Sequence, residues 1–194
     1  MVRLENEKGH LPSDWRTVRI SADDAVRGFE VRVGAIRIGT RVIGLHLFIE
    51  KEEQLDQIFE RLGSALGKVI EHRALDVEHE AKPKEQILEE AKALFNEERY
   101  WECHEILERV SSMPGGVEIG SPEAKLFQGL VLVAAAFIHY QRASQQIALS
   151  VLQRSLRKLE AWTEDSYMSL DVKSLKENIQ RIINSNEISP FQLN

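Results

Sequence analysis

The chain has 194 residues, of which 43% are hydrophobic and 29% charged, and its formal net charge is -6. This composition supports a folded core and excludes a largely disordered chain, and the acidic balance gives no overall attraction to nucleic acid or to an anionic membrane. The one cysteine excludes an internal disulfide and fits a reducing compartment, so we expect a cytoplasmic protein.

The sequence has no segment typical of secretion or membrane insertion. Its first residues include Arg3, Glu5 and Lys8 rather than a basic and then an apolar stretch, so we expect no signal peptide. The longest apolar run, residues 126–138, is interrupted by Gln128 and is shorter than the roughly 20 residues that cross a bilayer. We therefore expect no membrane partner.

The first part of the chain has the pattern of a small α+β domain. Apolar and polar residues alternate from residue 15 to residue 50, which predicts strands near 15–20, 29–38 and 41–50, with a short turn or helix at 21–27. Helical spacing over residues 51–66 then predicts one main helix, and residues 69–77 predict a last strand. We expect an antiparallel or mixed sheet with this helix on one face.

The second part of the chain is helical. Pro83 suits the first turn of a helix and follows a polar stretch, so we place the domain boundary there and predict domains at residues 1–80 and 81–194. Helical periodicity predicts a bundle of about five helices, near residues 83–96, 100–111, 122–143, 145–162 and 171–184. Ser121 and Pro122 form a good start for the third of these helices, and the polar stretch after Ile183 predicts a loose end.

The predicted helix at 100–111 concentrates residues that carry chemistry. His104 and Glu108 lie four apart and share a helix face, and Glu105 lies three before Glu108, so the three side chains can converge. Such a group can hold a divalent metal ion, or a carboxylate can orient the imidazole as a general base. Cys103 falls instead on an apolar stripe of the same helix, which predicts a packing role.

Two known metal patterns do not fit this helix. The spacing is similar to the His-Glu-x-x-His helix of metalloproteases, but residue 108 is Glu and no motif for a third ligand follows. A ferritin-like di-iron bundle needs Glu-x-x-His on two helices, and Trp101 and Ala136 stand three positions before His104 and His139.

The apolar helix near 122–143 carries two polar residues on one face, Gln128 and His139. Their eleven-residue separation corresponds to about 16 Å along a helix, so they cannot bind one small ion together. We favour an interpretation in which both are buried and hydrogen-bonded to acids of the neighbouring helix, and we keep a ligand or catalytic site as the alternative.

The two helices together resemble a known family. The resemblance covers roughly residues 85–162 and rests on Leu94-Phe95-Asn96, Tyr100, Glu102, His104-Glu105, Glu108, Phe127-Gln128-Gly129-Leu130, Ala134-Ala135 and His139. These residues are similar to the family called domain of unknown function 309, whose members are small helical bundles. The resemblance implies an all-helical fold and a set of site residues, but no activity, because the family has none established.

Arginines dominate the basic residues of the predicted sheet, and no lysine lies between Lys8 and Lys51. Arg32, Arg37 and Arg41 are the candidates for a basic sheet face that binds phosphates or single-stranded RNA. A solvated face or a protein interface is the interpretation that we favour, because nearby acids dilute the charge, and we do not expect nucleic acid as the main partner.

The sequence thus predicts an α+β protein that is a non-catalytic binding or scaffold module. Its pocket residues would be Tyr100, Glu102, His104, Glu105, Glu108, Gln128 and His139. The first alternative is a metal-dependent enzyme, such as a hydrolase, with His104 and Glu108 as ligands of a divalent metal and with Glu105 and His139 as the catalytic candidates. The second is nucleic-acid binding through the arginine face. A homodimer is left open, because the central helix is more apolar than one bundle requires.

Overall fold

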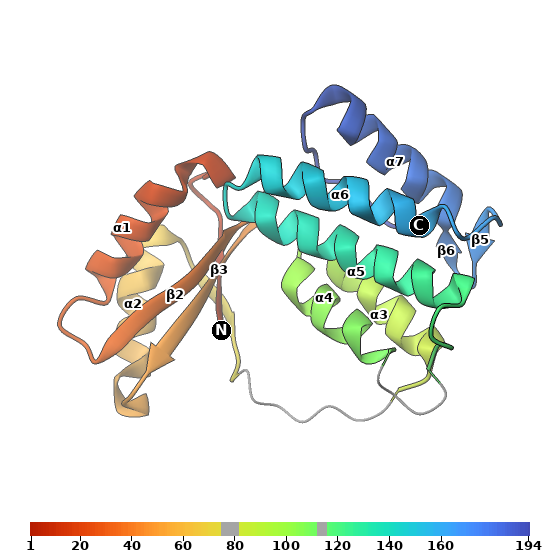
Figure 1. The fold of residues 1–194 in the computed structure, drawn as a ribbon. Coiled ribbons are helices and arrows are strands. Elements are labelled where there is room, and N and C mark those ends of the chain that lie inside the picture. The colour runs from red at the N-terminus through yellow and green to blue at the C-terminus, as the bar shows by residue number, and fades with distance from the viewer. Residues whose placement is uncertain (75–81, 112–115) are drawn as a thin grey trace. The chain divides into compact units, whose positions relative to one another are not determined.

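The computed structural model describes residues 1–74, 82–111 and 116–194 and confirms the predicted α+β class (Figure 1). Contacts divide the chain into two compact units, Met1–Glu78 with Gln141–Ala143 and His79–Tyr140 with Ser144–Asn194. We describe the sheet-containing N-terminal unit and the helical unit separately.

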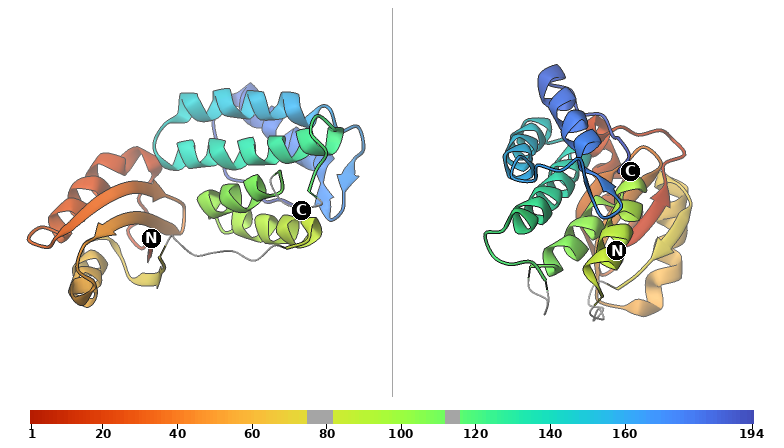
Figure 2. Two further views of the ribbon diagram at one scale, coloured as in Figure 1. Left: turned by 60° about the horizontal axis from the view of Figure 1, so that its bottom comes forward. Right: turned by 90° about the vertical axis from the view of Figure 1, so that its right-hand side faces the viewer.

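The N-terminal unit is a four-stranded antiparallel sheet with two helices on one face (Figure 2). The strands are β1 (Val2–Glu5), β2 (Val31–Ile38), β3 (Val42–Ile49) and β4 (Val69–His72), in the spatial order β2-β3-β1-β4. Helices α1 (Trp15–Ala25) and α2 (Leu55–Leu66) follow the short 3-10 turns Pro12–Asp14 and Glu52–Gln54.

Alternate strand residues build the core of this unit. They face the two helices because strand side chains point to opposite faces in turn. The fully buried members are Leu4, Ile36, Ile38, Ile43 and Leu45 from the sheet and Val18, Ala22, Ile58, Leu62 and Leu66 from the helices.

Helix α1 corrects the prediction of a strand at residues 15–20. Val18, Ala22 and Ala25 are the buried residues of this helix, and their spacing of four and three is that of a helix face. The alternation of apolar and polar residues at 15–20 therefore arises from the outer side of a helix and does not indicate a strand. Arg19, on the same helix, donates hydrogen bonds of 2.9 Å to the carbonyls of Val33 and Gly34, where β2 is irregular.

Strand β1 was not predicted, although it lies between β3 and β4 in the sheet. It has four residues, too few for the alternation of Val2 and Leu4 to stand out. The predicted strand at 69–77 is confirmed over Val69–His72, and its residues 75–77 lie outside the described residues. Gly67 ends α2 with φ 139, and a Cβ there would lie 2.1 Å from the Glu5 carbonyl oxygen, so only glycine fits this turn.

The helical unit contains the five predicted helices, within the ranges that the structure describes. They are α3 (Lys84–Asn96), α4 (Tyr100–Arg109), α5 (Pro122–Gln141), α6 (Gln145–Leu159) and α7 (Val172–Ser185), and a small hairpin of β5 (Ser166–Tyr167) and β6 (Leu170–Asp171) precedes α7. The start predicted for α5 is confirmed, because the Ala124 N–H donates to Ser121 Oγ at 3.0 Å. In the described ranges no helix combines the length and apolar character that a bilayer crossing requires.

Helices α5 and α6 lie side by side and pack closely at one glycine (Figures 1 and 2). A Cβ on Gly129 would lie 2.6 Å from Leu159 Cδ2 and 2.7 Å from Leu159 Cγ, and Leu159 is fully buried. The Ser155 hydroxyl donates to the Gly129 carbonyl at 2.9 Å inside this contact. The small residue thus allows the two helix backbones to approach each other.

The residues after α7 are ordered against the bundle, so the prediction of a loose end was wrong. Ile188 and Leu193 are buried, and Phe191 packs against the aromatic rings of Phe95 and Phe137. Three apolar side chains in an otherwise polar stretch are enough to fix it, because each removes apolar surface from water.

Candidate functional site

Helix α4 separates a packing face from a polar face. Its buried face carries Tyr100, Cys103, Ile106 and Leu107, which belong to the core of the helical unit. His104, Glu105 and Glu108 lie on the remaining surface, where they are half-buried or exposed. Periodicity therefore separates the two groups of residues in the way that the sequence predicted.

Three of the polar residues on this helix, Tyr100, Glu102 and Cys103, are buried inside the helical unit. Tyr100 is 1% exposed and lies 4.8 Å from Phe95 and 4.9 Å from Phe137 between ring centroids. Burial raises the pKa of the Tyr100 hydroxyl and of the Cys103 thiol well above their usual range, so neither ionises at neutral pH. Glu102 is also buried and accepts a hydrogen bond of 3.1 Å from Arg99 Nε.

The remaining residues form a His–Glu cluster, defined as His104, Glu105 and Glu108. Each carboxylate approaches a different nitrogen of the imidazole: Glu105 Oε1 lies 3.7 Å from Nδ1, and Glu108 Oε1 lies 3.7 Å from Nε2. The ring of Trp101 stacks on the imidazole of His104, with centroids 6.2 Å apart and planes 16° from parallel. The cluster therefore places an imidazole between two negative charges.

The same cluster offers one ligand atom from each residue within 4.8 Å of one another, the spacing from which a metal site could be assembled. A metal ion binds one nitrogen of a histidine at about 2.0–2.1 Å, so the carboxylate beside the other ring nitrogen would have to move toward the ion. The donor set of one imidazole and two carboxylates fits zinc or a harder divalent cation. His139 is not a member of this group in the described part of the chain.

A groove of about 500 Å³ opens beside the cluster. We call it the acidic groove, and it is lined by Glu105, Glu108, Arg109, Ser111, Gln128 and Val131. The side chains of Glu105 and Glu108 are 42% and 58% exposed, so both carboxylates can be reached from solvent. Helices α4 and α5 supply its walls, which explains why residues from two separate sequence motifs meet there.

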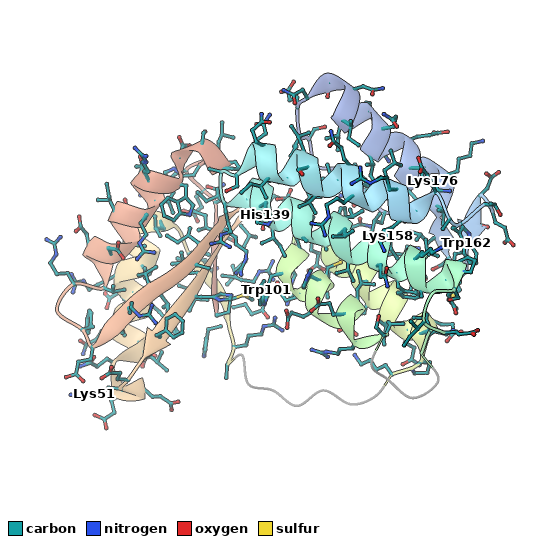
Figure 3. The ribbon with its side chains drawn as sticks, viewed as in Figure 1. Lys51, Trp101, His139, Lys158, Trp162 and Lys176 are labelled. Carbon is teal, nitrogen blue, oxygen red and sulfur yellow. The ribbon has the colours of Figure 1, made fainter. Side chains whose placement is uncertain are left out.

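Gln128 and His139 have different surroundings, and only Gln128 lines the acidic groove. Gln128 is exposed, lines the acidic groove and accepts a hydrogen bond of 2.8 Å from Lys158 of α6, which corrects the prediction that it is buried against acids of α4. His139 is half-buried near the end of α5, and Figure 3 shows it well separated from Lys158 of α6, the hydrogen-bond partner of Gln128. The predicted separation of Gln128 and His139 along α5 is therefore confirmed.

Sequence patterns did not identify every residue of the groove. Arg109, Ser111 and Val131 line it but were not among the predicted pocket residues. Four residues were predicted but do not line it, namely Tyr100, Glu102, His104 and His139. Helical spacing was the available signal, because Arg109 lies four after Glu105 and Val131 lies three after Gln128.

The three arginines of the sheet have different surroundings. Arg32 stacks over the ring of Phe48 with its guanidinium carbon 4.1 Å from the centroid, and Arg41 is exposed. Arg37 is 7% exposed and lies 2.8 Å from His46 Nε2, which must accept because a guanidinium has only donors. Burial, with the Arg37 charge as the next cause, lowers the pKa of His46 to about 4. These contacts leave Arg32 and Arg41 as the more exposed candidates for a basic face.

Comparison with known proteins adds one match. No curated protein matches the chain. A family model described as "Domain of unknown function (DUF309)" matches residues 88–151, a range that runs from α3 into α6 and contains both the His–Glu cluster and the acidic groove. The predicted resemblance is therefore confirmed over residues 88–151, which match the domain of unknown function 309 family, and the rest of the chain does not match its model.

Proposed function

We propose that the helical unit is a non-catalytic binding module whose acidic groove receives a basic side chain, lysine or arginine, of a partner protein. The observation that carries this proposal is the pair of exposed carboxylates, Glu105 and Glu108, at the wall of a groove of about 500 Å³. A volume of this size suits a side chain and its neighbours, and ligand pockets commonly range from about 300 to 1,000 Å³.

The other lining groups support a polar, orienting contact. Ser111 and Gln128 supply neutral hydrogen-bonding groups, and Val131 supplies an apolar surface for the stem of a long basic side chain. Arg109 and the nearby Lys158 limit the net negative charge, so the groove would select a ligand by geometry as well as by charge.

Two buried groups argue against a nucleophilic enzyme built on α4. Cys103 and Tyr100 have raised pKa values because they are buried, and both lie in the core rather than in the groove. An enzyme would therefore have to work through the His–Glu cluster itself.

A binding assay with charge controls tests the proposal. The probe is a fluorescent tetra-arginine peptide, with tetraglutamate as the opposite charge, and binding is measured by fluorescence anisotropy at low salt. Glu105→Gln with Glu108→Gln should weaken binding about twofold to thirtyfold, since each of the two exposed charge pairs contributes roughly 0.2–1 kcal/mol.

The matched control is Asp56→Asn with Glu60→Gln. These two exposed acids lie four apart on α2 and change the net charge by the same amount. Equal weakening by the two double variants would show that the peptide responds to overall charge, and the groove would then lose its assignment.

The metal-dependent enzyme is retained as a second candidate because three potential ligand atoms lie within 4.8 Å of one another. Calorimetric titration with Zn²⁺ and with Mn²⁺ separates it from the binding module. Stoichiometric binding that is lost in His104→Ala and kept in His139→Ala would favour the metal centre over the binding module. Equal heats for wild type and His104→Ala would reject the metal centre.

A further inference from the structure

The stretch after α7, which we call the end segment (Ile188–Asn194), is held through its backbone. The side-chain amide of Asn96 donates to the Leu193 carbonyl at 2.9 Å and accepts from the Leu193 N–H at 2.7 Å. One side chain thus meets both polar backbone groups of one residue, a contact that recognises an extended chain whatever its side chain. A second anchor is the Asp171 N–H, which donates to the Asn194 carbonyl at 2.8 Å.

Apolar side chains of the end segment provide the specificity. Ile188 and Leu193 are 5% and 7% exposed. The ring of Phe191 lies 5.4 Å from that of Phe95 and 5.5 Å from that of Phe137, in tilted and edge contacts that aromatic pairs prefer. We call the surface that receives these groups the seat, and its members are Leu88, Phe95, Asn96, Leu107, Leu130 and Phe137.

The apolar part of the seat belongs to the core of the helical unit, but the segment that fills it differs from the other parts of that core. Its occupant has neither helix nor strand structure, so it makes no regular hydrogen bonds of its own. A small apolar cavity of about 10 Å³ remains beside Leu193, lined by residues of α3, α4 and α5. The cavity has room for no more than about one water molecule, so the segment packs closely against these three helices.

The connection to α7 can act as a hinge. Asn186 ends α7 in the left-handed conformation with φ 55, which asparagine tolerates but does not prefer. Pro190 restricts the backbone before Phe191 to extended shapes. Rotation at Asn186 would break the bonds from its N–H to the Ile183 carbonyl and from Gln145 to its own carbonyl, and would release an already extended segment.

We propose that the seat is an interface between two copies of this chain, which exchange their end segments. A second copy presents the one sequence known to fit the seat, because that sequence occupies it here. In an exchanged pair, every seat makes the same contacts as in the closed monomer. The equilibrium between monomer and exchanged dimer therefore depends on the protein concentration and on the conformation of the hinge at Asn186. This inference does not depend on the acidic groove, since the groove and the seat have no lining residue in common.

Complementary variants of the full chain test the exchange. Asn96→Ala damages the seat and leaves the segment intact, whereas Phe191→Ala with Leu193→Ala damages the segment and leaves the seat intact. Neither variant should pair with itself, but their mixture should form a heterodimer with one repaired seat. Native mass spectrometry at protein concentrations up to about 1 mM, the order of the effective concentration of a tethered segment, measures the pairing.

The control replaces Asn96→Ala by Asn184→Ala, an exposed asparagine of α7 outside the seat. This variant should pair with itself as the wild type does. Circular dichroism establishes that each variant is folded. Folded variants that stay monomeric when mixed would overturn the proposal.

Two further measurements keep the test decisive. A labelled peptide of residues 187–194 should bind the Phe191→Ala, Leu193→Ala chain, and Asn96→Asp in that chain should weaken it about tenfold through loss of the amide donor. Peptide binding without any heterodimer would assign the seat to a different protein and refute the exchange. If Asn96→Ala does not fold, mixing ¹⁵N-labelled and unlabelled wild-type chains should give dimers of mixed mass, and their absence would again refute it.

Discussion

Glu123 joins three elements of the helical unit through one carboxylate oxygen. Lys84 of α3 donates to Oε1 at 2.8 Å, and the Tyr167 hydroxyl of β5 donates to the same atom. Burial alone raises the pKa of Glu123, but the hydrogen bonds from Lys84 and Tyr167 and the Lys84 charge outweigh it, so the pKa lies below its usual 4.5. Burial and the carboxylate both raise the pKa of Tyr167, which therefore stays a donor.

Glu123→Gln should lower the free energy of unfolding by about 1 to 2 kcal/mol near neutral pH, because it removes charge-assisted hydrogen bonds. A carboxyl whose pKa is lowered by folding stabilises the fold above its unfolded pKa of 4.5, and this contribution is lost as the pH falls through the folded value. The difference between the variant and the wild type should therefore shrink below that pH. Urea unfolding over a pH series measures it.

Glu164→Gln is the control for this prediction, because Glu164 is exposed. It should change stability little at any pH. A Glu123→Gln deficit that is equally large in acid would show that the lost contribution is packing rather than charge.

At the scale of elements, the close packing of α5 on α6 depends on the absence of a side chain at Gly129. Gly129 belongs to the Phe-Gln-Gly-Leu stretch that carries the family resemblance, and its neighbour Gln128 contacts Lys158 of α6. Alanine favours a helix over glycine by about 1 kcal/mol, so propensity alone would predict that Gly129→Ala stabilises the protein. Contact with the buried Leu159 predicts the reverse.

We expect Gly129→Ala to destabilise the helical unit by about 1 to 3 kcal/mol, the usual cost of overpacking. Gly63→Ala on α2 is the matched control, because nothing lies within 4 Å of a Cβ placed there. It should stabilise the N-terminal unit by about 0.5 to 1 kcal/mol. Differential scanning calorimetry gives both values, and a stabilising Gly129→Ala would show that the two helices can move apart at low cost.

Sequence patterns that extend over many residues predicted their elements correctly, whereas short patterns did not. Helices α3, α4, α6 and α7 repeat an apolar face, whereas α5 is apolar over most of its length and was predicted from its long apolar run and its start at Ser121 and Pro122. Residues 15–20 offered two alternating pairs, a pattern that the outer face of α1 produces equally well. The end segment failed for another reason, since Asn96 lies far away in sequence and its bonds to Leu193 follow no period.

The candidate site shows the same division. The convergence of His104, Glu105 and Glu108 follows from helical spacing and could be predicted. The groove could not, because Gln128 and Val131 reach it through the packing of α5 on α4. That packing is decided by core residues distributed along the chain, which no local pattern records.

At the scale of the whole molecule, we propose that residues 1–80 and 81–194 are two domains that fold independently. Each unit has its own cluster of buried apolar residues, so neither needs the other to bury its core. The division also agrees with the match of the family to residues within the second range alone.

The fragment 81–194 should therefore give a helical circular dichroism spectrum and unfold cooperatively. The fragment 100–194 lacks α3, which supplies Ile87, Leu88, Ala91 and Phe95 to the core, and should not fold. If 81–194 also fails to fold, the chain is one cooperative domain and the proposed boundary is wrong.

Cys103 gives this molecule a built-in chemical reporter. The thiol is the only one in the sequence, it is 1% exposed, and it lines the small cavity beside Leu193. A thiol reagent can therefore modify the native chain only when the bundle opens around Cys103. The rate of modification thus measures how often the bundle opens there. Departure of the residues around Leu193 would uncover this cavity, so the labelling rate of the wild-type protein would respond to that event without any change to its sequence.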